Sequence, residues 1–291
     1  MDNLLNNLRQ RIPIQEISIP KELSDDELLN VLTEISQENP YYVKSFFNKL
    51  FRTDIDQDEF YELFSEVINS KPKQVTETDI ITYNINGVLV KIRETPRIIS
   101  GSGTTGLRTW EAALYLSLYL SNHLELVQNG NVLELGTGTG LVSLYLLKEP
   151  KLKLQDLIIT DGDSALIESL SHNFKLNDIS IASVNCHSLW WGKDVVPSSI
   201  DTIIAADVTY DAEVIPSLVK CIQTGLEQGA KQALIAATIR NEDTIKVFEE
   251  TIVQNGLNFT IESRVRKPSE LDATVWFSQL TQEIRIYKIT K

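Results

Sequence analysis

The segment Val132-Leu-Glu-Leu-Gly136-Thr-Gly138-Thr-Gly140 joins a short apolar strand pattern to three alternating glycines. Glycine lets the backbone pass close to a ligand because no Cβ stands in the way, and a helix that follows offers its free N–H groups. A glycine-rich turn between strand and helix can also be purely structural. The loop therefore indicates a ligand site only if neighbouring strand ends add polar partners.

The spacing of these glycines disfavours a dinucleotide. The dinucleotide fingerprint is G-x-G-x-x-G, and its third glycine would fall at position 141, which is Leu. A cofactor with a carboxylate and a nucleoside but no pyrophosphate suits the spacing better. S-adenosylmethionine is such a cofactor.

From residue 130 onward the chain alternates between strand and helix patterns, which predicts a doubly wound, mostly parallel sheet. Seven strands are expected, and the last two lack an obvious helix between them, which indicates an antiparallel pair at one end. The expected strands are 131–135, 156–160, 179–185, 201–206, 232–238, 259–265 and 283–290. The expected helices are 140–148, 163–176, 212–228 and 241–255.

The N-terminal part has a different pattern, and we expect a helical extension over 1–75. Ser24-Asp-Asp-Glu27 has the spacing of a capping box before an apolar helical stripe, and 41–51 and 57–68 read as further helices. This extension is either a cap on the main domain or a substrate-recognition module. A β-hairpin with a linker is expected over 76–100, because Asn86-Gly87 suits a type I′ turn between 80–85 and 88–92. The main domain then covers 101–291, with a glycine-rich loop at 100–106 and a helix from 110 to about 124.

Two strand ends supply partners for a nucleoside. Asp161 ends the second strand, where a carboxylate can accept hydrogen bonds from ribose hydroxyls. Asp163 lies nearby, but its position is that of a helix N-cap. An indole of the pair Trp190-Trp191 can stack on adenine, although tandem tryptophans are as often packing residues.

The fourth strand ends in Ala205-Ala206-Asp207-Val208-Thr209-Tyr210. Ligands of open α/β sheets lie outside the carboxyl ends of the strands, so Asp207 and Tyr210 are expected at the reactive end of the cofactor. Asp207 could instead cap the helix that follows.

Taken in order, VLELGTGTG, TDGD, LWWG and AADVTY resemble the family-16 seven-β-strand protein methyltransferases, which have a Rossmann-like class I fold. Two segments are more particular, 103–113 (GTTGLRTWEAA) and 238–241 (TIRN). They are similar to the elongation factor 2 lysine methyltransferases, especially the fungal branch. The resemblance covers about residues 100–260.

The resemblance implies an S-adenosylmethionine-dependent protein-lysine methyltransferase with elongation factor 2 as its substrate. Asp207 and Tyr210 would be the catalytic pair and would orient the amine. Trp191 is preferred over Trp190 because the family places an aromatic residue directly before glycine. The implied cofactor contacts are Trp110, Gly136, Thr137, Gly138, Asp161, Trp191 and Ala206.

The charge and the cysteine and histidine content limit the classes of partner and ligand that the chain can bind. The net charge of −13 over 291 residues disfavours nucleic acid and suits a basic protein partner, although an acidic surface also simply confers solubility. Two cysteines without CxxC spacing fit a reducing compartment, and three isolated histidines disfavour zinc. No signal peptide or membrane span is apparent, so we expect a cytoplasmic monomer without metal. A methyltransferase that acts on another translation-related protein, on RNA or on a small molecule, and a non-catalytic scaffold, remain the alternatives.

Overall fold

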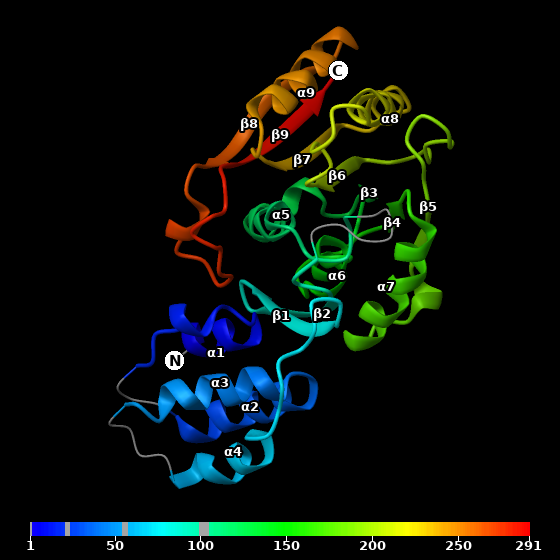
Figure 1. Ribbon diagram of the computed structural model, residues 1–291. Coiled ribbons are helices and arrows are strands. Elements are labelled where there is room, and N and C mark those ends of the chain that lie inside the picture. The colour runs from blue at the N-terminus through cyan, green and yellow to red at the C-terminus, as the bar shows by residue number, and fades with distance from the viewer. Residues whose placement is uncertain (1, 21–23, 54–57, 99–104) are drawn as a thin grey trace.

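The computed structural model describes residues 2–20, 24–53, 58–98 and 105–291 and has a seven-stranded sheet at its centre (Figure 1). The strand order is β5-β4-β3-β6-β7-β9-β8, and β9 alone runs antiparallel, to both of its neighbours. The predicted doubly wound, mostly parallel sheet is thus confirmed. The strands are β3 (Asn131–Leu135), β4 (Asp156–Asp161), β5 (Asn185–Ser188), β6 (Thr202–Ala206), β7 (Gln232–Thr238), β8 (Asn258–Val265) and β9 (Ile284–Thr290).

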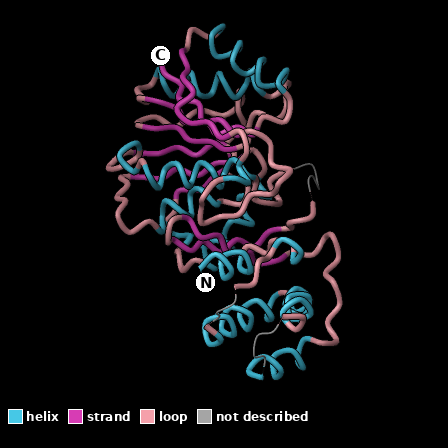
Figure 2. Tube along the Cα trace, turned by 90° about the vertical axis from the view of Figure 1, so that its left-hand side faces the viewer, coloured by secondary structure: helices cyan, strands magenta, loops and turns pink. Residues whose placement is uncertain are grey.

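Helices cover both faces of the sheet (Figure 2). Alternate residues of each central strand enter different cores: Leu133 and Leu135 pack with the helices of one face, and Val132 packs with those of the other. This alternation follows from the two-residue period of a strand and explains why the central strands are apolar throughout. One face carries α5 (Glu111–Asn122), α6 (Leu141–Lys148) and α7 (Ser164–Leu176), and the other carries α8 (Ile215–Glu227) and α9 (Glu242–Gln254).

The strand predicted at 179–185 is wrong. The structure has a 3₁₀ turn at Ile181–Ser183 there, and β5 begins only at Asn185. The apolar residues Ile179, Ile181 and Val184 suggested a strand, but β5 is a short, mostly exposed edge strand without an apolar pattern of its own. Such a strand is held by its pairing with β4 rather than by burial.

The N-terminal helices form a separate hydrophobic core beside the sheet domain (Figure 1). These helices are α1 (Asp2–Arg9), α2 (Asp25–Glu38), α3 (Pro40–Leu50) and α4 (Tyr61–Val67). The hairpin of β1 (Asp79–Ile85) and β2 (Val88–Glu94) packs into the core of the sheet domain instead. None of the helices in the described ranges is long and apolar enough to cross a membrane.

Local signals in this region agree with the structure in part. Asn86 and Gly87 have φ of +48° and +99°, as the predicted type I′ turn requires. Ser24 is the N-cap of α2, but its side chain makes no capping hydrogen bond, so the expected capping box is not formed. Of the helix predicted at 57–68, position 57 lies outside the described residues. The remainder is shorter than predicted, since α4 covers only Tyr61–Val67 after a 3₁₀ turn at Asp58–Phe60.

Candidate active site

A cavity of about 600 Å³ lies at the carboxyl ends of β3, β4 and β6. All nine residues predicted from the sequence line it: Trp110, Gly136, Thr137, Gly138, Asp161, Trp191, Ala206, Asp207 and Tyr210. Carboxyl ends of neighbouring parallel strands share one edge of a sheet, which is why segments far apart in sequence meet here. Of the glycine-rich loop predicted at 100–106, positions 100–104 lie outside the described residues, while Thr105 and Gly106 line the cavity.

The glycine loop closes the cavity at the end of β3. Gly136 has a φ of +66°, and a Cβ there would lie 2.7 Å from Cγ1 of Val208 and 3.4 Å from the ring of Trp191. Both the backbone conformation and the space therefore demand glycine. The Thr137 hydroxyl donates to Glu134 at 2.9 Å, so its proton is already engaged and its oxygen can only accept from a ligand.

Asp161 holds the loop from the end of β4. Its carboxylate accepts hydrogen bonds from the amides of Gly138 at 3.0 Å and Asp163 at 3.1 Å. Each oxygen keeps a lone pair for a further donor, and burial raises the pKa of this carboxyl. Asp163 is the N-cap of α7, where it accepts from the amide of Ala165 at 2.8 Å, as the sequence predicted.

Glu134 lies beneath the loop and was not singled out in the sequence. It is 2% exposed and accepts from the hydroxyls of Thr137 and Ser143. Burial raises its pKa to about 7 despite these donors. A buried carboxyl group held by two hydroxyl donors thus supports the floor of the cavity.

The two tryptophans occupy different positions. Trp190 is 53% exposed, its ring lies near Gly162, and the ammonium of Lys193 lies 4.4 Å from the ring centroid. Trp191 lies against Gly136 and packs partly into the core, and its Nε1 is buried with no hydrogen-bond partner in the described structure. An indole N–H of this kind has lost water without gaining an acceptor, so a ligand atom that reached it would satisfy it.

Asp207, at the end of β6, is 8% exposed and has a φ of +55°. Its carboxylate accepts from the amide and hydroxyl of Thr238, both at 3.0 Å, and from Arg240 at 3.0 and 3.2 Å. It also accepts from the amide of Ala112 at 3.3 Å, in the first turn of α5. The alternative that Asp207 caps the following helix is wrong, because α8 starts only at Ile215 with Val214 as its N-cap.

Trp110 lines both this cavity and a neighbouring one. The guanidinium carbons of Arg108 and Arg240 lie 4.5 and 4.6 Å from its ring centroid. The carboxylate of Glu111 forms ion pairs with both arginines, at 2.8 Å from Arg108 and 3.4 Å from Arg240. Arg108 and Glu111 were not predicted as site residues, although both lie within two positions of Trp110 in segment 103–113.

The comparisons with known proteins agree with this geometry. A family model described as lysine methyltransferase matches residues 97–254, a range that contains every residue lining the cavity. Protein-lysine N-methyltransferase EFM3 of Saccharomyces cerevisiae is 38% identical over 259 residues, 80% of this chain and 75% of the yeast protein. EFM3 of Chaetomium thermophilum is 35% identical over 71% of this chain and 66% of its own. Protein-lysine N-methyltransferase EEF2KMT of Homo sapiens is 29% identical over 84% of this chain and 82% of the human protein.

Proposed function

The chain belongs to the lysine methyltransferase family, and from that premise we propose that it transfers methyl groups from S-adenosylmethionine to a lysine ε-amine of elongation factor 2. The observation that carries the proposal is the single cavity in which the glycine loop, Asp161, Trp191 and Asp207 meet. Segment 105–113 contributes to the lining of that cavity, and segment 238–241 reaches it through the hydrogen bonds of Thr238 and Arg240 to Asp207. These two segments are the ones that resemble elongation factor 2 methyltransferases.

The residues present fit the cofactor. The buried, unpartnered Nε1 of Trp191 calls for an acceptor, and Asp161 retains lone pairs for ribose hydroxyls. Gly136 keeps the floor of the cavity free of a side chain. When bound, S-adenosylmethionine supplies an electrophilic methyl group on a sulfonium sulfur. The residues proposed to hold it are Trp110, Gly136, Thr137, Gly138, Asp161, Trp191 and Ala206.

The acceptor end is organised by Asp207 and Tyr210. Because five hydrogen bonds to four donor groups already engage the carboxylate of Asp207, we assign it a positioning role that fixes α5 and the end of β7. Tyr210 is 56% exposed at the rim and is the group that would orient the incoming amine.

The amine must lose its proton to act as a nucleophile, and an ordinary lysine has a pKa of about 10.4. Partial desolvation of the amine in the cavity beside Trp110 favours its neutral form. Holding the amine in line then contributes much of the acceleration. No covalent intermediate with the protein is required.

Labelled methyl transfer in extracts of cells that lack this protein tests the function. Adding the purified chain with labelled S-adenosylmethionine should label one band of the mass of elongation factor 2. Gly136→Ala protein serves as the control and should label nothing. Labelling confined to RNA or small molecules would contradict the proposal. If nothing is labelled and the protein does not bind S-adenosylmethionine, the non-catalytic scaffold is the function that remains.

A further inference from the structure

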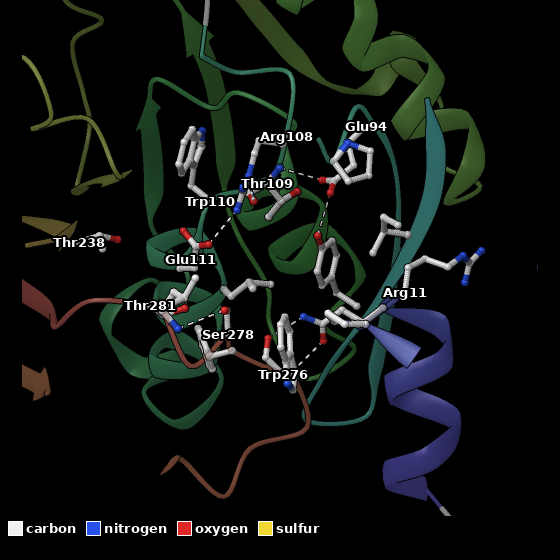
Figure 3. Close-up of a pocket in the computed structure, with 18 of the residues that line it drawn as sticks. Arg11, Glu94, Arg108, Thr109, Trp110, Glu111, Thr238, Trp276, Ser278 and Thr281 are labelled. Atoms are coloured by element: carbon white, nitrogen blue, oxygen red, sulfur yellow. Dashed lines mark hydrogen bonds and ion pairs between the residues drawn. The ribbon is translucent and has the colours of Figure 1, made fainter. Parts of the chain in front are cut away.

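A second cavity, of about 550 Å³, adjoins the first and shares Arg108 and Trp110 with it (Figure 3). Its walls come from distant parts of the chain: the end of α1, the β1–β2 hairpin, the start of α5, the end of β7 and the loop before β9. A protein segment that presents a lysine beside Trp110 therefore has this cavity next to it.

The two cavities differ in how much of their lining lies within the range matched by the family model. Among the residues that the structure describes, those lining the first fall between Thr105 and Ser217, all within the matched range 97–254. The second takes most of its lining from outside that range, at positions 10–13, 81–96 and 276–282. The N-terminal extension and the C-terminal loop thus add to a methyltransferase core a cavity that the core alone does not build.

This added wall is fixed in place. The Gln10 side chain donates to the carbonyl of Trp276 at 2.7 Å, and the amide of Trp276 donates back to Gln10 at 2.8 Å. Trp276 also packs against the core of the N-terminal helices. Figure 3 shows Trp276 and Ser278 on one side of the cavity, with Glu94 and Thr109 opposite.

Glu94 is the charge in this cavity without a counter-ion. It is 5% exposed and accepts from the Tyr83 hydroxyl at 3.1 Å and the Thr109 amide at 2.8 Å. No cation lies within ion-pair distance of Glu94 in the described residues, and burial raises its pKa to about 7. The guanidinium groups of Arg108 and Arg240 are already paired, with Glu111 and Asp207.

We propose that this cavity binds a cationic side chain, lysine or arginine, that flanks the acceptor lysine of the protein substrate, with Glu94 as its counter-ion. The proposal rests on the proposed function and names the chemistry of the substrate segment. Tyr83, Trp276 and Phe277 provide aromatic surface for the aliphatic stem and the charge. An anionic side chain would meet Glu94. The three arginines of the cavity, Arg11, Arg108 and Arg240, are already paired with Asp79, Glu111 and Asp207.

Glu94→Gln tests the proposal in steady-state methylation of purified elongation factor 2. We expect KM for the protein to rise by about tenfold, because a charge-assisted hydrogen bond is lost, with kcat and the Kd of S-adenosylmethionine within about twofold of wild type. Exposed Glu227→Gln is the charge-matched control and should change none of these. An unchanged KM for Glu94→Gln would overturn the proposal.

The pH dependence of KM separates this role from a merely structural one. A bound cation requires the ionised form of Glu94, so the wild-type KM should fall as pH rises through about 7. The ratio of the KM of Glu94→Gln to that of wild type should therefore grow from pH 6 to pH 8. A ratio that does not vary with pH would contradict the role.

A binding measurement decides the proposal even if elongation factor 2 is not the substrate. A blocked tri-arginine peptide and its tri-citrulline analogue are titrated into the cofactor-saturated protein at fixed salt. Wild type should bind the arginine peptide about tenfold more tightly than Glu94→Gln does, and neither should prefer the citrulline peptide. Equal affinity of wild type and Glu94→Gln for the arginine peptide would overturn the cation site, whereas failure to methylate elongation factor 2 would overturn only that substrate.

Discussion

Arg240 donates from both terminal nitrogens to the two carboxylate oxygens of Asp207, at 3.0 and 3.2 Å. The pair ties the end of β6 to the residues after β7, and the same guanidinium stacks on Trp110. A planar fork of this kind fixes orientation as well as charge, which lysine cannot do. The wall between the two cavities therefore depends on Arg240.

Replacement of Arg240 should weaken both stability and catalysis. Arg240→Gln leaves the carboxylate of Asp207, 5% exposed in its side chain, without its cation, and should lower the free energy of unfolding by about 2 kcal/mol. Methyl transfer should fall by more than about tenfold because Trp110 loses its support. Urea unfolding and initial rates measure the two effects.

Arg264→Gln is the control for Arg240→Gln. Arg264 also pairs with a carboxylate, Glu283 at 2.6 Å, but its side chain is 41% exposed. Its loss should cost about 0–1 kcal/mol and leave the rate unchanged. Equal effects of the two variants would show that the Asp207 pair has no special role.

Gly136→Ala should abolish cofactor binding. The added methyl group meets Val208 at 2.7 Å in a left-handed conformation, so the loop must shift into the cavity. Gly256→Ala is the matched control, with a φ of +71° and open space around its Cβ. Both should lose about 1–2 kcal/mol of stability, but only Gly136→Ala should lose calorimetric binding of S-adenosylmethionine. Retained binding would place the cofactor elsewhere.

Features that depend on neighbouring residues in the chain, such as the central strands and the motifs at their ends, were predicted from the sequence. The central strands are apolar on both faces, so the fold class followed from the chain alone. Asp161 and Asp207 were predicted from their place at strand ends, whereas Trp110 and the choice of Trp191 came from the family resemblance. Contacts between distant segments carry no such pattern. Arg240 meets Asp207 across 33 positions and Gln10 meets Trp276 across 266, and the second cavity is built from contacts of this kind. The exposed strand β5 was misplaced because pairing, not burial, defines it.

The two tryptophans should differ in their effect on cofactor affinity. Trp191→Ala removes the ring beside Gly136 and its unpartnered Nε1, and should weaken S-adenosylmethionine binding by more than about tenfold. Trp190→Ala removes a ring that is 53% exposed, and should change the Kd by less than about threefold. If calorimetry shows a larger loss of affinity for Trp190→Ala than for Trp191→Ala, Trp190 and not Trp191 is the residue that contacts adenine.

Glu134 should make stability depend on pH. Burial raises its folded-state pKa from 4.5 to about 7, so the folded protein keeps a proton that the unfolded chain releases in this window. The corresponding stability is fully present below the unfolded pKa and is lost as pH rises through about 7. The loss amounts to about 3 kcal/mol.

Glu134→Gln removes this titration, while its amide oxygen can still accept from Thr137 and Ser143. The unfolding free energy of the variant minus that of wild type should therefore increase from pH 5.5 to pH 8. Denaturant unfolding at each pH provides the measurement. A difference that stays constant with pH would refute the buried titration.

Mass-spectrometric mapping of purified elongation factor 2, after incubation with this protein and S-adenosylmethionine, tests the central claim most directly. The account predicts methylation of a lysine ε-amine that depends on Gly136 and Trp191 and that is strongly reduced in Arg240→Gln. An unmodified elongation factor 2, with a wild-type protein that binds S-adenosylmethionine, would contradict the assigned substrate.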